Sequence, residues 1–296
     1  MGIKKETLYQ LERIANALER IANALEQDQA PKELLLDRPV PEKELPQGVS
    51  RGTRNQLTTP RAAELFLRQR GFAIRPITGT RQLEPSSDLV SLAQFMGKNY
   101  SLIRSFYLEL KTHLSKGTTL VFPFENLSSA AIEATREFGD QLYQAGLLSE
   151  MSQNGVPWLS ARPSREGRAI NFLTGKWLEH FIWDQLRQVV GPAQPIDYLM
   201  NRQVILPDGR DFEFDIVAMI DGNPFWFEAK SGNYAPYLPK YADISQILGL
   251  NSEQSFLVLA EIGNTFPSEI TARCHMTVTS PADFSTTLSQ RLAPGA

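Results

Sequence analysis

Residues 224–234 read PFWFEAKSGNY, an apolar and aromatic run that contains one glutamate and one lysine. In a β-strand, residues two apart point to the same face, so Trp226, Glu228 and Lys230 are expected on one face. A carboxylate and an ammonium group in a half-buried strand lose hydration, and this loss is tolerated chiefly where a ligand or a reaction uses the pair. The stretch therefore indicates a strand that carries a functional site.

A second strand-like run precedes this one. Residues 211–220 read DFEFDIVAMI, and the intervening Asp221-Gly222-Asn223 is a strong hairpin-turn signal. Alternation predicts one face with Phe212, Phe214, Ile216, Ala218 and Ile220, and the other with Glu213, Asp215, Val217 and Met219. Pairing of the two strands can therefore bring Asp215 close to Glu228 and Lys230.

The surrounding C-terminal sequence alternates strand-like and helix-like segments. Strands are expected at 198–206, 255–260 and 276–279, and helices at 164–191, at 239–250 and from Pro281 onward. Glu179 lies in the middle of the first of these helices, which leads into the sheet. The pattern predicts an α/β fold in which helices surround a central mixed sheet.

The order of these residues, an aspartate, twelve residues, then Glu-x-Lys behind a glutamate-bearing helix, resembles the PD-(D/E)xK nuclease superfamily, the restriction-endonuclease-like fold. The resemblance covers about residues 166–260. TGKWLEHFIW, EFD and FEAKSG together look most similar to the nuclease domains of CRISPR-ancillary effectors that carry a CARF sensor. No Gly-rich βα repeat that would form such a sensor is found upstream, so activation by a cyclic oligonucleotide is not implied.

The resemblance implies hydrolysis of phosphodiester bonds with Mg²⁺ or Mn²⁺. Asp215 and Glu228 would hold the metal together with the main-chain carbonyl of Ala229, since such cations prefer hard oxygen ligands. Lys230 would orient or help to deprotonate the attacking water. Glu179 is either a further ligand, often through water, or the site of a second metal. An inactive relative and an ordinary surface hairpin are the alternatives.

Other side chains near the motif are candidates for supporting roles. Glu213 is expected to point the same way as Asp215, where it is equally well a supporting or a solvent-facing residue. By resemblance, Gln246 is matched to the glutamine on the following helix of RecB-like relatives. Tyr234, Tyr237, Lys240 and Tyr241 follow the motif. These side chains can grip or stack on a nucleic-acid strand, or pack the lip of the site.

The segment before the nuclease-like region is basic. Residues 51–120 contain 11 basic and 4 acidic residues, although the whole chain has a net charge of −3. Ala93, Gly97 and Ile103 have the spacing of a helix-turn-helix unit, with Gly97 at the turn. Three cations could then meet phosphates, namely Lys98, Arg104 and Lys111. Two packed helices that touch no nucleic acid are the alternative.

A strand at 119–124, a helix from 128 to 148 and a hairpin within 149–163 follow. The hairpin is the wing of a winged-helix fold or a closing ribbon. We therefore expect residues 61–163 to form a helical, winged-helix-like domain that binds nucleic acid, and residues 164–296 to form the nuclease domain.

The N-terminus repeats ERIANAL at 12–18 and 19–25. Apolar residues recur there at alternating spacings of three and four, which predicts a coiled-coil helix over residues 1–29. Homo-oligomerisation through this helix is favoured over its docking on the same chain. Residues 30–60 contain five prolines and are expected to form a linker.

Composition excludes several classes of protein. Hydrophobic residues make up 42% and charged residues 21%, as in an ordinary soluble globular protein. No run approaches the roughly 18 apolar residues of a membrane span, and MGIKKETLYQ is not a secretory signal. The single Cys274 excludes a disulfide framework, and three histidines argue against structural zinc. We expect a cytoplasmic protein without a membrane partner.

These observations predict a metal-dependent endonuclease that acts on nucleic acid, with DNA favoured. The resemblance places it in prokaryotic antiviral defence, with a protein partner in a defence complex. The alternative is a catalytically silent nucleic-acid-binding adaptor that oligomerises through its N-terminal helix. Intact Asp215, Glu228 and Lys230 favour the enzyme.

Overall fold

The computed structural model of the protein describes residues 61–76, 86–153, 155, 157–263 and 265–292. Contacts divide the chain into Met1–Thr58 and Thr59–Ala296, and every described element belongs to the second unit. The predicted coiled coil at 1–29 and the linker at 30–60 lie outside the described residues.

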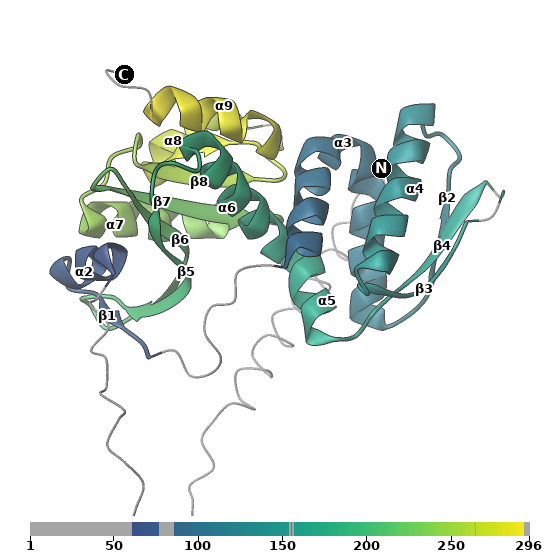
Figure 1. Ribbon diagram of the computed structural model, residues 1–296, viewed down its shortest axis with the longest axis horizontal. Helices are drawn as coiled ribbons and strands as arrows, with labels where there is room; N and C mark the ends of the chain where they lie inside the picture. Colours follow the sequence, from purple (N-terminus) through teal and green to yellow (C-terminus); the bar gives the residue numbers. More distant parts are fainter. Residues whose placement is uncertain (1–60, 77–85, 154, 156, 264, 293–296) are drawn as a thin grey trace, which may run out of the picture. The chain divides into compact units, whose positions relative to one another are not determined.

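A six-stranded mixed sheet with the order β1-β5-β6-β7-β8-β9 confirms the predicted mixed α/β architecture (Figure 1). The first four strands in this order pair antiparallel, whereas β7, β8 and β9 pair in parallel. The strands are β1 (Ala73–Ile74), β5 (Asp197–Ile205), β6 (Asp211–Ile220), β7 (Asn223–Lys230), β8 (Ser255–Leu259) and β9 (Thr277–Thr279). The strands predicted from the sequence are all present.

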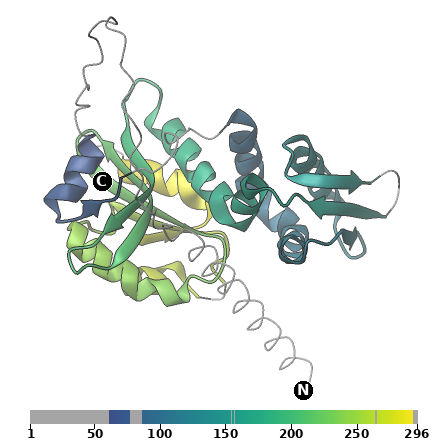
Figure 2. The ribbon, with the colours of Figure 1, turned by 90° about the horizontal axis from the view of Figure 1, so that it is seen from below.

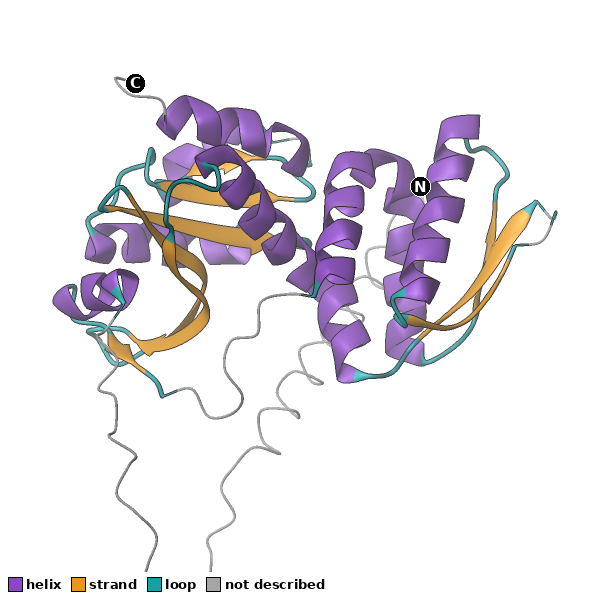
Figure 3. Ribbon diagram, in the orientation of Figure 1, coloured by secondary structure: helices purple, strands orange, loops and turns teal. Residues whose placement is uncertain are grey.

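Helices cover both faces of this sheet (Figure 3). α6 (Trp177–Val190) and α9 (Pro281–Leu292) share a core with Phe225 and Phe227 of β7. α2 (Ala62–Gln69), α7 (Leu238–Leu248) and α8 (Pro267–Cys274) share a second core with Trp226. The alternation expected for β7 is therefore confirmed, because its odd and even residues pack into different cores.

The turn between β6 and β7 follows from two residues with a positive φ. Asp221 has a φ of 49° and Gly222 a φ of 76°, and Ile220 pairs with Asn223 across them. A two-residue turn with both central residues at positive φ matches the twist of antiparallel strands. The predicted hairpin is confirmed, and it fixes which residues of β6 and β7 face each other.

The alternation predicted for β6 is wrong beyond Asp215. Phe212 and Phe214 pack in the core that contains Trp226, whereas Ile216, Ala218 and Ile220 pack in the core on the opposite face. Met200 pairs with Ile216 and Arg202 with Phe214, so Asn201, which has a φ of 50°, lies opposite Asp215. The change of face in β6 thus occurs at Asp215, opposite this left-handed residue of β5, while the register of the two strands is kept.

The helix expected at 164–191 is divided. α5 (Gly167–Asn171) is followed by a π-helical turn at Phe172–Lys176, in which Gly175 leaves helical geometry, and then by α6. Glu179 therefore lies in the first turn of α6 rather than in the middle of a helix, as we had expected.

A smaller three-stranded sheet packs with two further helices (Figure 2). Its strands, in the order β2-β4-β3, are β2 (Leu120–Pro123), β3 (Leu148–Ser152) and β4 (Trp158–Pro163). The helices are α3 (Ser87–Lys116) and α4 (Ser129–Gln144). The predicted strand, helix and antiparallel hairpin are all confirmed. Residues 61–76, which we had grouped with this part, instead supply α2 and β1 to the large sheet.

The helix-turn-helix expected at Gly97 is wrong, because α3 runs through this position without a turn. A Cβ atom built on Gly97 would lie 2.2 Å from the ring of Phe181 in α6. The glycine is therefore used for close packing of α3 on α6. Among the described helices, none is long and apolar enough to cross a membrane.

Gly97→Ala is expected to lower the free energy of unfolding by about 1–3 kcal/mol, because the buried Phe181 ring must move. At an uncrowded interior helix position the same change would raise it by about 1 kcal/mol, so the sign is diagnostic. Gly167→Ala, at a helical position with no atom within 4 Å of the new Cβ, is the control. Denaturant unfolding measures both, and a Gly97→Ala variant as stable as the wild type would contradict the packing.

Candidate active site

The site forms where β6 and β7 separate. The two strands pair from Ile220–Asn223 to Ile216–Phe227. From there β7 continues its parallel pairing with β8 as far as Lys230–Leu259. The main-chain groups just beyond the end of the β6–β7 ladder need other partners, because unpaired buried N–H groups are costly.

Two carboxylates supply those partners. The Asp215 carboxylate accepts a hydrogen bond of 2.8 Å from the main-chain N–H of Ala229. Conversely, the Glu228 carboxylate accepts one of 3.3 Å from the main-chain N–H of Asp215. Each acid thus bonds to the other strand, so the fork in the sheet itself holds Asp215 and Glu228 side by side.

Glu228 is the most deeply buried of these acids, with 1% of its surface exposed. Its carboxylate also accepts a hydrogen bond of 2.9 Å from the Trp226 indole. Burial, and then the charges of Glu228 and Asp215, raise the pKa of the Tyr241 hydroxyl. Burial and the adjacent Asp215 charge raise the pKa of Glu228 well above its ordinary value, outweighing the opposing effects of Lys230 and Trp226.

Lys230 supplies positive charge to this group of acids. Burial raises the pKa of Asp215, and the Lys230 ammonium partly offsets this rise. Burial alone would lower the pKa of Lys230, but the Glu228 and Asp215 carboxylates outweigh it and raise that pKa. The Lys230 Nζ lies 5.2 Å from the ring centroid of Tyr237 and 5.9 Å from that of Tyr241. Lys230 is therefore held as an ammonium between acids and aromatic faces.

Glu179 completes the group from the first turn of α6. Its carboxylate lies 3.4 Å from the Lys176 Nζ. Burial, followed by the Asp215 charge, raises the pKa of Glu179 to about 7, although Lys176 opposes the rise. Lys176 also donates to the side-chain oxygen of Asn201, the left-handed residue opposite Asp215.

The start of α6 is fixed by a buried tyrosine of α3. The Tyr107 hydroxyl donates to the carbonyl of Leu173 at 2.9 Å and accepts from the Trp177 indole at 3.0 Å. These two hydrogen bonds hold the π-helical turn that precedes Glu179 against α3. Sequence reasoning missed Tyr107, Lys176 and Asn201, although the i, i+3 spacing of Lys176 and Glu179 was a readable signal.

The structure thus brings together Asp215, Glu228, Lys230 and Glu179, the four residues expected to be catalytic. Two supporting candidates lie elsewhere. Glu213 is exposed and accepts a hydrogen bond of 3.2 Å from Gln203 on β5. Gln246 is exposed on α7, and the residue of that helix that reaches the site is Tyr241.

The five candidates for nucleic-acid contact differ in their surroundings. Lys98 is exposed on α3, and Arg104 forms an ion pair of 2.6 Å with Glu261. The Tyr234 hydroxyl donates to Ile262, and Lys240 lies over the Phe212 ring and donates to the carbonyl of Asp211. Lys111 is half-buried over the Tyr107 ring. Their binding roles stay predictions.

His180, the neighbour of Glu179, is not a surface residue. Its ring stacks on Phe172 at 6.1 Å, and its Nδ1 is buried without a hydrogen-bond partner among the described residues. Burial and Lys176 lower the pKa of His180 to about 4, so the ring is neutral near pH 7.

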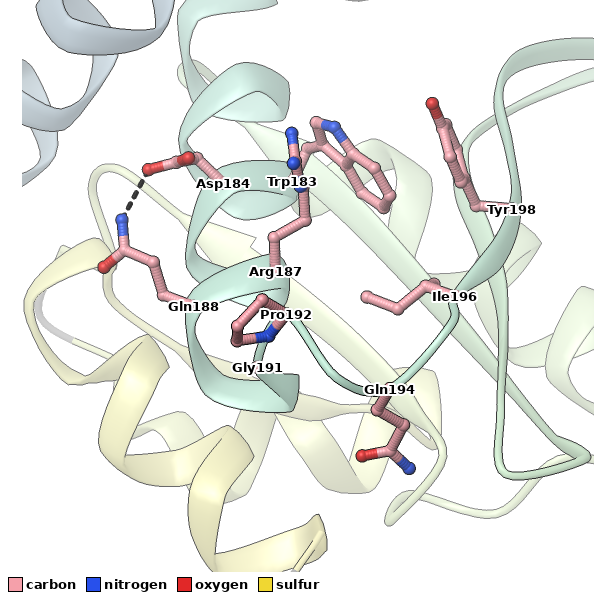
Figure 4. A pocket seen from close by; sticks show the side chains of 9 residues that line it. All are labelled: Trp183, Asp184, Arg187, Gln188, Gly191, Pro192, Gln194, Ile196 and Tyr198. Carbon is pink, nitrogen blue, oxygen red and sulfur yellow. Dashed lines mark hydrogen bonds between the residues drawn. The ribbon is translucent and has the colours of Figure 1, made fainter.

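A cavity of about 540 Å³ lies one to two turns along α6 from Glu179 (Figure 4). Trp183 and Tyr198 stand against each other there with ring centroids 3.9 Å apart. The guanidinium of Arg187 lies 6.0 Å from the Trp183 ring. Asp184 and Gln188 bond to each other on the outer side of the helix, away from these rings.

The oxygen donors of the site fit a divalent cation. In this structure, however, the acid side chains are not arranged around a common point. Asp215, Glu228 and Glu179 are desolvated acids with raised pKa values, and a hard cation would relieve their mutual repulsion. Within the described residues, however, no three His, Cys, Asp or Glu side chains are preassembled around one point. Glu228 would have to turn from Trp226 to bind.

The raised pKa of Glu179 predicts a pH-dependent stability. The folded chain retains a proton that the unfolded chain releases above pH 4.5, so the free energy of unfolding falls as pH rises from 4.5 through about 7. Glu179→Gln is expected to remove about 2–3 kcal/mol of that fall. Denaturant unfolding from pH 5 to pH 8 measures the effect, with the exposed Glu213→Gln as control. An equally steep fall in Glu179→Gln would contradict this assignment.

The chain matches no protein-family model and no curated protein. Solved structures that share its fold include the following two. Can2 from Sulfobacillus thermosulfidooxidans, solved in complex with cyclic tetra-adenylate, aligns over 77% of the chain with a TM-score of 0.53 and 15% identity. Protein VC1899 from Vibrio cholerae aligns over 78% with a TM-score of 0.52 and 19% identity. The chain spans 60% of the length of each. At these identities the likeness concerns the fold.

Proposed function

We propose that this protein is a divalent-metal-dependent nuclease that hydrolyses phosphodiester bonds of nucleic acid, with DNA favoured over RNA. The observation that carries the proposal is the fork of β6 and β7, where Asp215 and Glu228 hold each other's strand. Lys230 and Glu179 border the same point. Acids and a lysine that are buried together lose their hydration, and such clusters are typical of a reaction centre.

Mg²⁺ or Mn²⁺ would be held by Asp215, Glu228 and the main-chain carbonyl of Ala229, with Glu179 as a further ligand or a second site. A bound divalent cation neutralises charge on the phosphate and makes water nucleophilic at neutral pH. The hard oxygen donors of this set suit either ion.

Lys230 has a defined part in this scheme. Without a bound cation, the Glu228 and Asp215 carboxylates raise its pKa, so that it is an ammonium. Beside a bound cation it would orient or help to deprotonate the attacking water and offset charge that develops on the phosphate. The Lys230 ammonium lies over the rings of Tyr237 and Tyr241.

The biological setting is a further part of the proposal. The resemblance of TGKWLEHFIW, EFD and FEAKSG to nuclease domains of CRISPR-ancillary effectors supports a role in prokaryotic defence. The shared fold with Can2, solved with cyclic tetra-adenylate, supports a nucleic-acid-related partner. Homo-oligomerisation through residues 1–29, a protein partner in a defence complex and a cytoplasmic location belong to the same proposal.

One observation favours the alternative of a catalytically silent adaptor. The Glu228 carboxylate accepts hydrogen bonds from Trp226 and from the main chain of Asp215, which would hold it inward if no metal bound. The same arrangement suits an enzyme whose acid turns when metal arrives. Cleavage separates the two.

Wild-type protein is expected to cut labelled nucleic acid in the presence of Mg²⁺ or Mn²⁺ and not in EDTA. Single- and double-stranded DNA and RNA are compared on one gel. Glu228→Ala and Lys230→Ala should each lower the rate by at least 100-fold, because each removes metal binding or charge stabilisation.

Glu213→Ala is the matched control, since it removes an exposed acid two residues from Asp215 and should cut at the wild-type rate. Circular dichroism shows whether the variants fold. Wild-type protein that binds a strand tightly and never cuts it would support the adaptor instead.

A further inference from the structure

Lys111 of α3 is a half-buried cation that forms no ion pair with an acid in the described part of the chain. Its Nζ lies 5.3 Å from the ring centroid of Tyr107, the residue that clamps the start of α6. Among the described residues, no carboxylate lies within 4 Å of this Nζ. Burial lowers the pKa of Lys111, and only the more distant Glu261 opposes this. The Lys111 ammonium is therefore poorly hydrated, and no nearby negative charge balances it among the described residues.

Lys111 opens on a pocket of about 430 Å³, a volume within the range of small-ligand sites. Lys111, Ser231, Gly232, Asn233, Tyr234 and Glu261 are among its lining residues. Ser231 directly follows Lys230 in the chain, so the pocket begins where the catalytic strand ends. Lys230 of the proposed active site and Ser231 of the pocket are thus consecutive residues.

The one acid among these lining residues is already engaged. The Glu261 carboxylate accepts a hydrogen bond of 3.0 Å from the Tyr100 hydroxyl and forms an ion pair of 2.6 Å with Arg104. The Asn233 side-chain oxygen accepts from the main-chain N–H of Ala235, which leaves its NH₂ group able to donate into the pocket. Lys111 and the Asn233 amide thus make the pocket suitable for an anion.

We propose that this pocket binds a backbone phosphate of the nucleic-acid strand, next to the phosphate that is cut. The inference rests on the proposed function, because it uses the position of the pocket beside Lys230. A compact ammonium suits a phosphate as a point charge, and a contact with a backbone phosphate is independent of sequence. The hydroxyl of Tyr234, another lining residue, donates to the Ile262 carbonyl at 2.9 Å.

The test measures binding rather than cleavage. A fluorescent 15-nucleotide single strand and a duplex are titrated with the full chain in EDTA, and anisotropy gives the Kd at several salt concentrations. Lys111→Met keeps an apolar stem over Tyr107 and removes the charge. We expect it to weaken binding about five- to tenfold and to reduce the salt slope by about one. Lys111→Arg should restore most of the affinity.

Lys116→Met is the matched control. It removes the same charge from the same helix, five residues on, from an exposed position outside the pocket. It is expected to change the Kd less than twofold. Equal losses in both variants would show a general charge effect and overturn the assignment of a site.

The failure of this inference can be told apart from failure of the proposed function. Wild-type affinity in Lys111→Met would overturn the pocket and leave the nuclease untouched. Lys111-dependent binding with no metal-dependent cleavage would keep the pocket and overturn the nuclease. A Lys111-dependent thermal shift with inorganic phosphate, without binding of either oligonucleotide, would overturn the strand as the occupant.

Discussion

The crossed pair of hydrogen bonds between Asp215 and the Ala229 N–H, and between Glu228 and the Asp215 N–H, is the constraint on which the site depends. The strands of a sheet separate only where something replaces their ladder bonds. Here the carboxylates of Asp215 and Glu228 replace the ladder bonds. The separation of the strands therefore also brings the two acids together. A site built in this way is held by the stiffness of the sheet rather than by a mobile loop.

The acids that meet at the fork repel one another, and neighbouring side chains offset or position their charges. Lys230 and Lys176 approach the acids from β7 and from the turn before α6. The buried Tyr107 fixes that turn, and Gly97 allows α3 to lie close enough to α6 for Tyr107 to reach it. The smaller helical part thus contributes to the geometry of the acids, even though none of its residues is among them.

Much of the site could be predicted because it depends on local rules. Period-two alternation in residues 224–230 and the Asp221-Gly222 turn fix which residues meet across the hairpin. The change of face within β6 could not be predicted, since apolar residues continue to alternate along the strand on both sides of Asp215. The turn predicted at Gly97 is wrong because a glycine in a helical stretch is equally consistent with a turn and with close helix packing. The contact with Phe181, which the sequence does not reveal, shows that close packing applies here.

The central claim is that Asp215 and Glu228 hold a divalent cation at the fork of the sheet. Crystals soaked in Mn²⁺ and measured for anomalous scattering test it most directly. The account predicts one strong peak within bonding distance of Asp215, of a Glu228 carboxylate turned away from Trp226, and of the Ala229 carbonyl. A map with no peak at the fork, with Glu228 still bonded to Trp226 at saturating Mn²⁺, would contradict it.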